Sequence, residues 1–267
     1  MGLLCVPGKL AESGSFAAEI PVNSLYNLGK SQHISVEGLN GVAWDSGADR
    51  FLFHSLTFDP ARQSHVVTVP PSLDSTTPLA DIDSAYRMRG LAYLPVEDRF
   101  AMTHPLYGGN NPSILIFNMD TDGNPYETID LLTIGAGNPT CLTYIPRDND
   151  FATVFEDSQT SLTIVNRAGQ LVRSVDLAPK RVQVIRSVAF FNPGHPSGGQ
   201  FLIHAQPGRR LLVTDFELNV LGEFDAYPTL GLTRLGFYDL AAITSGKYAG
   251  AFAIYGDSGA LVIFSIK

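Results

Sequence analysis

The chain has 267 residues, of which 45% are hydrophobic and 16% charged, the composition of a globular protein with a sizeable core. Its 18 basic and 26 acidic residues give a net charge of −8, which argues against nucleic acid and against an anionic membrane surface as partners. No apolar run approaches the roughly 20 residues that cross a bilayer. The first ten residues lack the pattern of a secretory signal, so we expect a soluble protein, and its compartment stays unknown.

The two cysteines, Cys5 and Cys141, are far apart in the sequence. We expect two small buried side chains rather than a disulfide, because unpaired cysteine is among the most buried residue types. The chain contains no CxxC motif and no Cys/His cluster, so we expect no structural zinc site.

Five segments of the chain share one pattern, in which a short apolar strand ends in an aromatic residue and leads through a polar turn into a second apolar strand. In chain order these segments begin at Gly41, Gly90, Cys141, Ser187 and Leu235. The aromatic residues are Trp44, Tyr93, Tyr144, Phe190 and Tyr238, spaced 46 to 51 residues apart. This period matches the ~40–50 residues of a propeller blade.

Each repeat continues with further strand-like segments. The third strands are expected at HVVTVP, SILIFN, SLTIVN, RLLVTD and ALVIFSI, and the fourth at PLADID, YETIDLL, LVRSVDL and VLGEFDA. The last repeat stops after its third strand, and the segment SFAAEIPV (Ser15–Val22) has the character to supply the fourth. A strand from the other end of the chain would close the ring and hide a sheet edge.

The sequence therefore predicts one all-β domain over residues 1–267, a five-bladed β-propeller of four-stranded antiparallel blades whose ring is closed by an N-terminal strand. The expected blades cover approximately residues 34–83, 84–132, 133–179, 180–227, and 228–267 together with 14–22. Residues 3–7 (LLCVP) look like one strand more than five blades need, so a six-bladed ring is the alternative.

In a propeller, the start of each first strand and the end of each second strand meet at one mouth of the central channel, the face at which propeller enzymes usually carry their sites. Before the first strands stand Asn40, Arg89, Thr140, Arg186 and Arg234. At the ends of the second strands stand His54, His104, Glu156, His204 and Tyr255. We expect these side chains to gather in one polar funnel.

These residue types suit an acid–base site for a small anion. Guanidinium groups bind carboxylates and phosphates through paired hydrogen bonds, so the candidate substrate-binding residues are Arg89, Arg186, Arg234 and Asn40. The candidate catalytic residues, which could move a proton, are His54, His104, His204, Glu156 and Tyr255. The structural alternative is that the arginines pair with acidic residues of neighbouring blades and the histidines cap open sheet edges.

Two acidic patterns are weaker signals. Asn118, Asp120, Asp122 and Asn124 resemble a calcium loop, but the glycine and the bidentate glutamate of that motif are missing, so we expect a plain hairpin. Other acidic residues lie between first and second strands, where we expect solvated turns at the opposite mouth: Asp45, Asp49, Glu97, Asp98, Asp148 and Asp150.

The stretch GLNGVAWDSGADRFLFHS (Gly38–Ser55) resembles the repeat of the senescence-marker-protein/gluconolactonase-like and NHL-type propellers. The resemblance implies the propeller fold and extends weakly over the five repeats. In gluconolactonase-like enzymes an asparagine of this motif helps to bind a divalent metal, and only Asn40 matches. Arginines stand where acidic ligands are expected, so no cofactor is predicted and a divalent metal is not favoured.

Three functions follow from these observations. The first is a metal-independent enzyme acting on a small anionic or carbonyl-bearing substrate by lactone hydrolysis, lyase, isomerase or cyclase chemistry. The second is a non-catalytic propeller that binds a protein, a glycan or a small ligand. The third is a metal-dependent, lactonase-like hydrolase. We expect the first, with a small molecule as partner and without nucleic acid or membrane.

Overall fold

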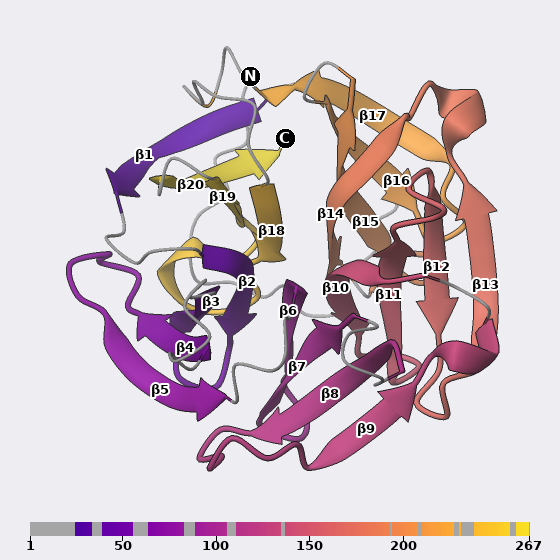
Figure 1. Cartoon of the computed structure of the whole chain (residues 1–267). Coiled ribbons are helices and arrows are strands. Elements are labelled where there is room, and N and C mark those ends of the chain that lie inside the picture. Colours follow the sequence, from indigo (N-terminus) through magenta and orange to yellow (C-terminus); the bar gives the residue numbers. More distant parts are fainter. Residues whose placement is uncertain are drawn as a thin grey trace.

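The structure, a computed structural model, describes residues 25–33, 39–55, 64–82, 89–105, 111–134, 137–192, 194–207, 210–226, 230, 238–256 and 260–266. The strands in these residues form five sheets of four antiparallel strands each. Figure 1 shows the five sheets as blades around a common centre. The chain is a five-bladed β-propeller, as predicted, and not the six-bladed alternative.

The first two blades are each built from four consecutive strands. Blade 1 contains β2 (Leu39–Asp45), β3 (Arg50–Ser55), β4 (Ser64–Val69) and β5 (Thr77–Ile82). Blade 2 contains β6 (Arg89–Leu94), β7 (Arg99–His104), β8 (Ser113–Asn118) and β9 (Glu127–Asp130). A short 3-10 turn, η1 (Leu132–Ile134), follows β9.

Blades 3 and 4 repeat this order. Blade 3 contains β10 (Pro139–Ile145), β11 (Asp150–Phe155), β12 (Ser161–Val165) and β13 (Leu171–Asp176), followed by η2 (Ala178–Lys180). Blade 4 contains β14 (Val184–Phe191), β15 (Gln200–Gln206), β16 (Arg210–Asp215) and β17 (Val220–Asp225). These strands confirm the predicted third and fourth strands of the repeat.

Blade 5 joins the two ends of the chain. It contains β18 (Tyr238–Ala242), η3 (Gly246–Tyr248), β19 (Phe252–Gly256) and β20 (Ala260–Ile266), and its outermost strand is β1 (Leu25–His33). Figure 1 shows β1 beside β20, and the register pairs Leu25 with Ile266 and His33 with Ala260. The ring is therefore closed by an N-terminal strand, but by Leu25–His33 and not by Ser15–Val22, which lies outside the described residues.

The core is divided among the five boundaries between blades. Each boundary holds one cluster of buried apolar side chains, including the boundary between blades 5 and 1. There, Phe53 of β3 packs edge-on against Tyr255 of β19, with ring centroids 5.3 Å apart. The second strand of a blade is covered on both faces by the neighbouring blades, so β11 is buried along its whole length. The outermost strand of the same blade, β13, is mostly exposed.

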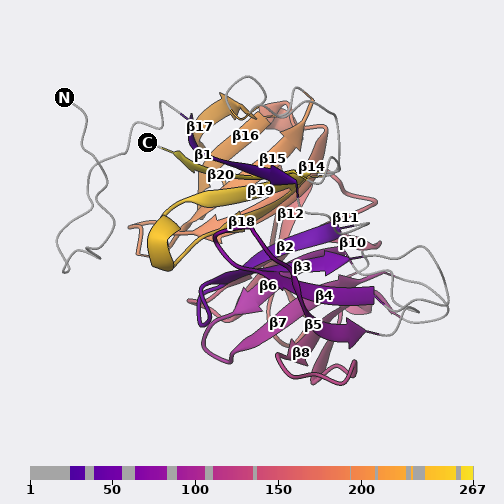
Figure 2. The same ribbon diagram turned by 90° about the vertical axis from the view of Figure 1, so that its left-hand side faces the viewer.

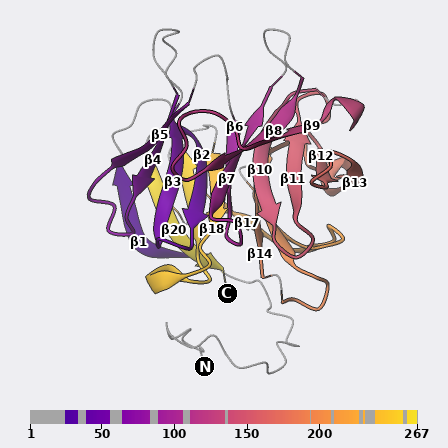
Figure 3. The same ribbon diagram turned by 90° about the horizontal axis from the view of Figure 1, so that it is seen from below.

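All five inner strands (β2, β6, β10, β14 and β18) pack against the inner strands of both neighbouring blades around the channel. We call the end of the channel where they begin the strand-start mouth, and the end where they turn into the second strands the turn mouth. Figures 2 and 3 show the ring from its side, with the strands running through its thickness. Among the described residues there is no helix with the length and apolar character of a membrane span.

Candidate functional site

Four inner strands contain a β-bulge close to the strand-start mouth. In β2 the pairing with β3 passes from Leu39–Ser55 to Gly41–His54, so Asn40 is the extra residue. The extra residues of β6, β10 and β14 are Gly90, Thr140 and Arg186. A bulge bends its strand and re-aims nearby side chains, and bulges are over-represented beside active sites. Three of the predicted positions before the first strands are bulge residues, and Arg89 directly precedes the fourth bulge.

The fifth repeat is shifted by four residues from its predicted alignment. Trp44 of blade 1 pairs with Phe51, and the corresponding pair in blade 5 is Ala242 with Phe252. The aromatic assigned to this position, Tyr238, was therefore misplaced. Tyr238 instead precedes Asp239 at the start of β18, as Asn40 precedes Gly41 in β2. Arg234 lies outside the described residues, so its predicted role stays a prediction.

Arg89 forms an ion pair across the boundary between blades 2 and 3. Its guanidinium Nη1 donates to Oε1 of Glu156, and the amide of Asn138 donates to the other carboxylate oxygen at 2.8 Å. The side chain of Arg89 is 47% exposed and that of Glu156 36%. The structure thus brings these two predicted residues together, in the arrangement that the structural alternative expects, while leaving both side chains partly exposed.

Two bulge residues are tied to their own blades. The Arg186 guanidinium donates to Oε1 of Gln206 at 3.1 Å, and the Thr140 hydroxyl donates to the carbonyl oxygen of Val154 at 3.1 Å. Both side chains are half-buried. These bonds hold the bulges in place and fix the direction of the Arg186 side chain.

Three of the predicted catalytic residues occupy one repeated position. His54, His204 and Tyr255 lie opposite Gly41, Ser187 and Asp239, respectively. All three side chains are buried. Burial lowers the pKa of His54 to about 3, with a smaller contribution from His65, so its imidazole is neutral at pH 7.

His104 lies one residue further along its strand than this repeated position. It is buried, and Ser113 Oγ lies 3.5 Å from its Nδ1. Burial lowers its pKa as well, although a hydrogen bond with the backbone of Asn111 acts in the opposite direction. His104 is therefore, like His54, a weak base.

Buried polar groups without hydrogen-bond partners gather at this end of the channel. Within the described part of the chain, the ring nitrogens of His54 and the hydroxyls of Thr103 and Ser187 are fully buried and unpaired. Such groups cost roughly 1–3 kcal/mol each unless water or a ligand satisfies them. Their number near the strand-start mouth is what a site for a polar ligand would produce, although the buried hydroxyl of Thr214, at the turn-mouth end of β16, is unpaired as well.

Asp239 is a site residue that the sequence prediction missed. It lies in β18, at the level that Gly41 has in β2, and is paired directly with Tyr255. Its Oδ2 accepts a hydrogen bond from the backbone N–H of Val42 in blade 1 at 2.9 Å, and its Oδ1 accepts one from Leu240 N–H at 2.9 Å. Burial raises the pKa of the carboxyl to about 7, against the effect of these two bonds.

A signal for Asp239 was present in the sequence. The segment DLAAITSG, from Asp239, aligns with GLAYLPVE, from Gly90, once the fifth repeat is not required to contain an aromatic. That alignment places an aspartate where the other repeats have glycine, cysteine or serine.

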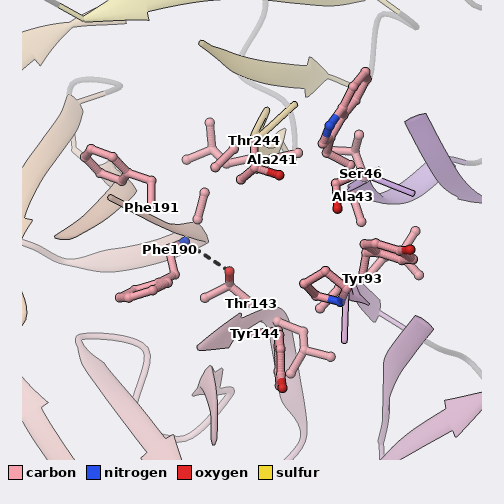
Figure 4. Close-up of a pocket in the computed structure, with 18 of the residues that line it drawn as sticks. Ala43, Ser46, Tyr93, Thr143, Tyr144, Phe190, Phe191, Ala241 and Thr244 are labelled. Atoms are coloured by element: carbon pink, nitrogen blue, oxygen red, sulfur yellow. Dashed lines mark hydrogen bonds between the residues drawn. The ribbon is translucent and has the colours of Figure 1, made fainter. Parts of the chain in front are cut away.

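The turn mouth has a different character. A cavity of about 110 Å³ opens there, and its floor is formed by the apolar side chains Val42, Leu91, Leu142 and Leu240. Figure 4 shows the hydroxyl ends of Tyr93 and Tyr144 pointing away from the centre of this cavity. The Thr143 hydroxyl accepts a hydrogen bond from the backbone N–H of Phe190 at 3.0 Å.

The polar ends of the aromatic residues cap the turns. Tyr93 donates to Asp98 at 2.8 Å, and Tyr144 donates to Asn149 at 2.9 Å. Asp98 and Asn149 have φ of 51° and 58°, the left-handed conformation that aspartate and asparagine tolerate in turns. The acidic turn residues at this mouth thus serve the fold, although Asp45 and Asp150 are buried rather than solvated as expected.

The acidic loop after β8 connects two paired strands, β8 and β9, as the hairpin prediction required. Asp122 Oδ1 accepts hydrogen bonds from the backbone and side chain of Asn124 at 3.2 and 3.1 Å. The described residues contain no group of three or more His, Cys, Asp or Glu side chains arranged to hold a metal. Cys141 is buried and unpaired, as expected, while Cys5 lies outside the described residues.

Comparison with known proteins shows the fold. No protein-family model and no curated protein matches the chain. Among solved structures, a protein of unknown function from Bacteroides caccae has a TM-score of 0.53 at 16% identity, over 82% of this chain and 70% of that one. A chain of the nidogen/laminin complex has a TM-score of 0.53 at 13% identity, over 84% of this chain and 74% of the matched chain. A protein of unknown function from Bacteroides thetaiotaomicron VPI-5482 has a TM-score of 0.56 at 14% identity, over 85% of this chain and 58% of the matched chain. These similarities extend along most of this chain and support the predicted propeller fold.

Proposed function

We propose that this chain is a small-molecule enzyme whose acid–base site lies at the strand-start mouth and takes an anionic or carbonyl-bearing substrate without a metal. The observation that carries the proposal is the β-bulge repeated in four inner strands at that mouth. A bulge interrupts the ladder of backbone hydrogen bonds, and a repeat that keeps this interruption within one residue of the same level indicates that the redirected side chains have a use.

The contrast between the two mouths also supports the proposal. At the turn mouth the polar ends of Tyr93 and Tyr144 have partners in their own turns. At the strand-start mouth the buried side chains of His54, Thr103 and Ser187 have none within the described residues. Buried polar groups that the protein leaves unsatisfied are more common where a ligand or water supplies the missing bonds.

The proposed roles follow from exposure and charge. Arg89 and Arg186 would bind the anion, because a guanidinium keeps its charge and offers several donors to a carboxylate or phosphate. Glu156, His204 and Tyr255 remain candidates for proton transfer or for hydrogen bonding to the substrate. His54 and His104, whose pKa values burial lowers, would act as neutral hydrogen-bonding groups.

The test is anion binding by arginine variants. We expect 2-oxobutyrate or inorganic phosphate to bind the wild type, and Arg186→Ala and Arg89→Ala to weaken binding at least tenfold in calorimetry. Arg147→Ala is the matched control, because Arg147 is 48% exposed and, like Arg89, paired with a carboxylate, but at the turn mouth. An equal loss of binding in the control, or unchanged binding in both site variants, would refute the proposed site.

A second function, binding without catalysis, is favoured by one observation. The Arg89–Glu156 pair already neutralises a guanidinium that the enzyme would use, and paired charges at a mouth are common in purely structural surfaces. A bound anion that is released chemically unchanged after long incubation, with no exchange of its protons, would favour this second function.

A further inference from the structure

The level just inside the strand-start mouth contains a single acidic side chain. The residues at this level of the five inner strands are Gly41, Gly90, Cys141, Ser187 and Asp239. Two of them are glycines because the blades approach closely there: a Cβ on Gly90 would lie 2.6 Å from the backbone nitrogen of Leu142. Asp239 is thus the one carboxylate in a ring of small residues.

Its hydrogen bonds fix the orientation of this carboxylate. One oxygen accepts from Val42 N–H of the neighbouring blade and the other from Leu240 N–H, each at 2.9 Å. Each carboxylate oxygen can accept two hydrogen bonds, so one acceptor direction per oxygen is left after these bonds. The group is therefore oriented by the backbone and still able to take a proton.

Asp239 lies between an apolar region of the channel and a polar one. Val42 and Leu240, which donate the two bonds, also line the floor of the apolar cavity of the turn mouth. On the other side, the Arg186 bulge begins the next inner strand of the ring, β14. Asp239 is buried, with 9% of its surface exposed.

We propose that Asp239 is the acid–base residue of this site and that the substrate is a small 2-oxo carboxylate, or a close analogue, whose carbon next to the carbonyl gives up a proton. This inference rests on the proposed function, since it needs the anion at the strand-start mouth. The substrate carboxylate binds at the arginines, and its carbonyl end extends into the channel toward Asp239.

The proton-transfer step is balanced without a further reactant. The C–H bond breaks as an O–H bond forms on the Asp239 carboxylate, and the electron pair of the C–H bond enters an enolate whose charge rests on the carbonyl oxygen. The carboxyl proton then exchanges with solvent. Delivery of a solvent-derived proton to the same carbon completes an exchange, and delivery to a neighbouring atom completes an isomerisation. A general base is most effective when its pKa lies close to the working pH, and the raised pKa of the Asp239 carboxyl agrees with this requirement.

Deuterium exchange tests this step without knowledge of the natural reaction. We expect the wild type in D₂O to catalyse the loss of the C3–H proton signal of 2-oxobutyrate, followed by NMR, at least a hundredfold faster than Asp239→Asn, with binding retained within about threefold. Asp150→Asn is the matched control, because Asp150 is also a buried carboxyl with a pKa raised by burial but lies at the turn mouth. It should exchange at the wild-type rate.

A second variant keeps the test informative if Asp239→Asn does not fold. Asp239→Ala leaves a space in which added formate can take the place of the carboxylate, and we expect formate to restore exchange. Binding without exchange in the wild type, or equal exchange by the wild type and Asp239→Asn, would overturn the role of Asp239 and leave the proposed anion site intact. The absence of any binding that depends on Arg186 would overturn both.

Discussion

At the scale of single residues, the protonation of Asp239 couples the stability of the fold to pH. Burial raises the pKa of the carboxyl to about 7 in the folded protein, above the ordinary value of 3.8 that applies to the unfolded chain. The folded state therefore binds the proton more tightly. This contribution to stability is fully present below about pH 4 and is lost as the pH rises through 7.

We therefore predict that the free energy of unfolding of the wild type, measured relative to that of Asp239→Asn, falls by roughly 3 kcal/mol between pH 5 and pH 8. Urea unfolding at several pH values measures the difference, and the comparison with the variant cancels the other titrating groups. A difference that stays constant or rises over this range would show that the carboxyl is ionised well below neutral pH in the folded protein.

Thr143 provides a second prediction at this scale. Its hydroxyl accepts the bond from Phe190 N–H in the channel, so Thr143→Val leaves a buried N–H unpaired and should cost about 1–3 kcal/mol of stability. Thr244→Val is the control, because Thr244 lines the same cavity but is exposed, and should change stability by less than about 0.5 kcal/mol. Equal effects in thermal melting would argue against the Thr143 bond.

The residue types of the site could be predicted from the sequence, but not their partners. Arg89 and Glu156 were predicted to share one mouth, and the structure pairs them. The bulges could not be predicted, because an extra residue in a strand changes backbone pairing without changing the apolar pattern. Asp239 was missed because Tyr238 offered an aromatic at a regular spacing, although packing in blade 5 puts Ala242 at that position.

At the scale of the strands, the approach of neighbouring inner strands depends on Gly90. Its φ of 67° is in the left-handed region, and a side chain would also collide with the backbone of β10. Gly90→Ala should therefore cost roughly 3 kcal/mol or more, from strain and from overpacking.

Gly194 offers the matched control for this substitution. A Cβ added there would have no heavy atom within 4 Å, so Gly194→Ala should be close to neutral. Chemical denaturation of both variants compares them. A Gly90→Ala protein as stable as the control would mean that blades 2 and 3 can separate at this level without loss of stability.

At the scale of the whole molecule, the periodicity of the sequence was sufficient to predict five blades and to predict that an N-terminal strand completes the last blade. It was not sufficient to identify the closing strand. The segment SFAAEIPV was preferred for its apolar alternation, whereas the strand that closes the ring reads LYNLGKSQH. An outermost strand is held by backbone bonds to β20 and has one side facing solvent, so it needs little apolar character.

Truncation separates the two candidate closing strands. A chain that begins at Leu25 retains β1, and we expect its melting temperature to stay close to that of the full chain. A chain that begins after His33 loses β1, exposes the edge of β20, and should melt lower by on the order of 10 °C and self-associate. Equal melting of the two truncated chains would contradict closure by Leu25–His33.

We propose that the strand-start mouth, and not the turn mouth, holds the ligand. A crystal structure of the protein soaked with 2-oxobutyrate tests it most directly. We expect electron density for the carboxylate within hydrogen-bond distance of the Arg186 guanidinium, with the carbonyl end directed toward Asp239. Density in the cavity beside Thr143, with the strand-start mouth empty, would contradict it.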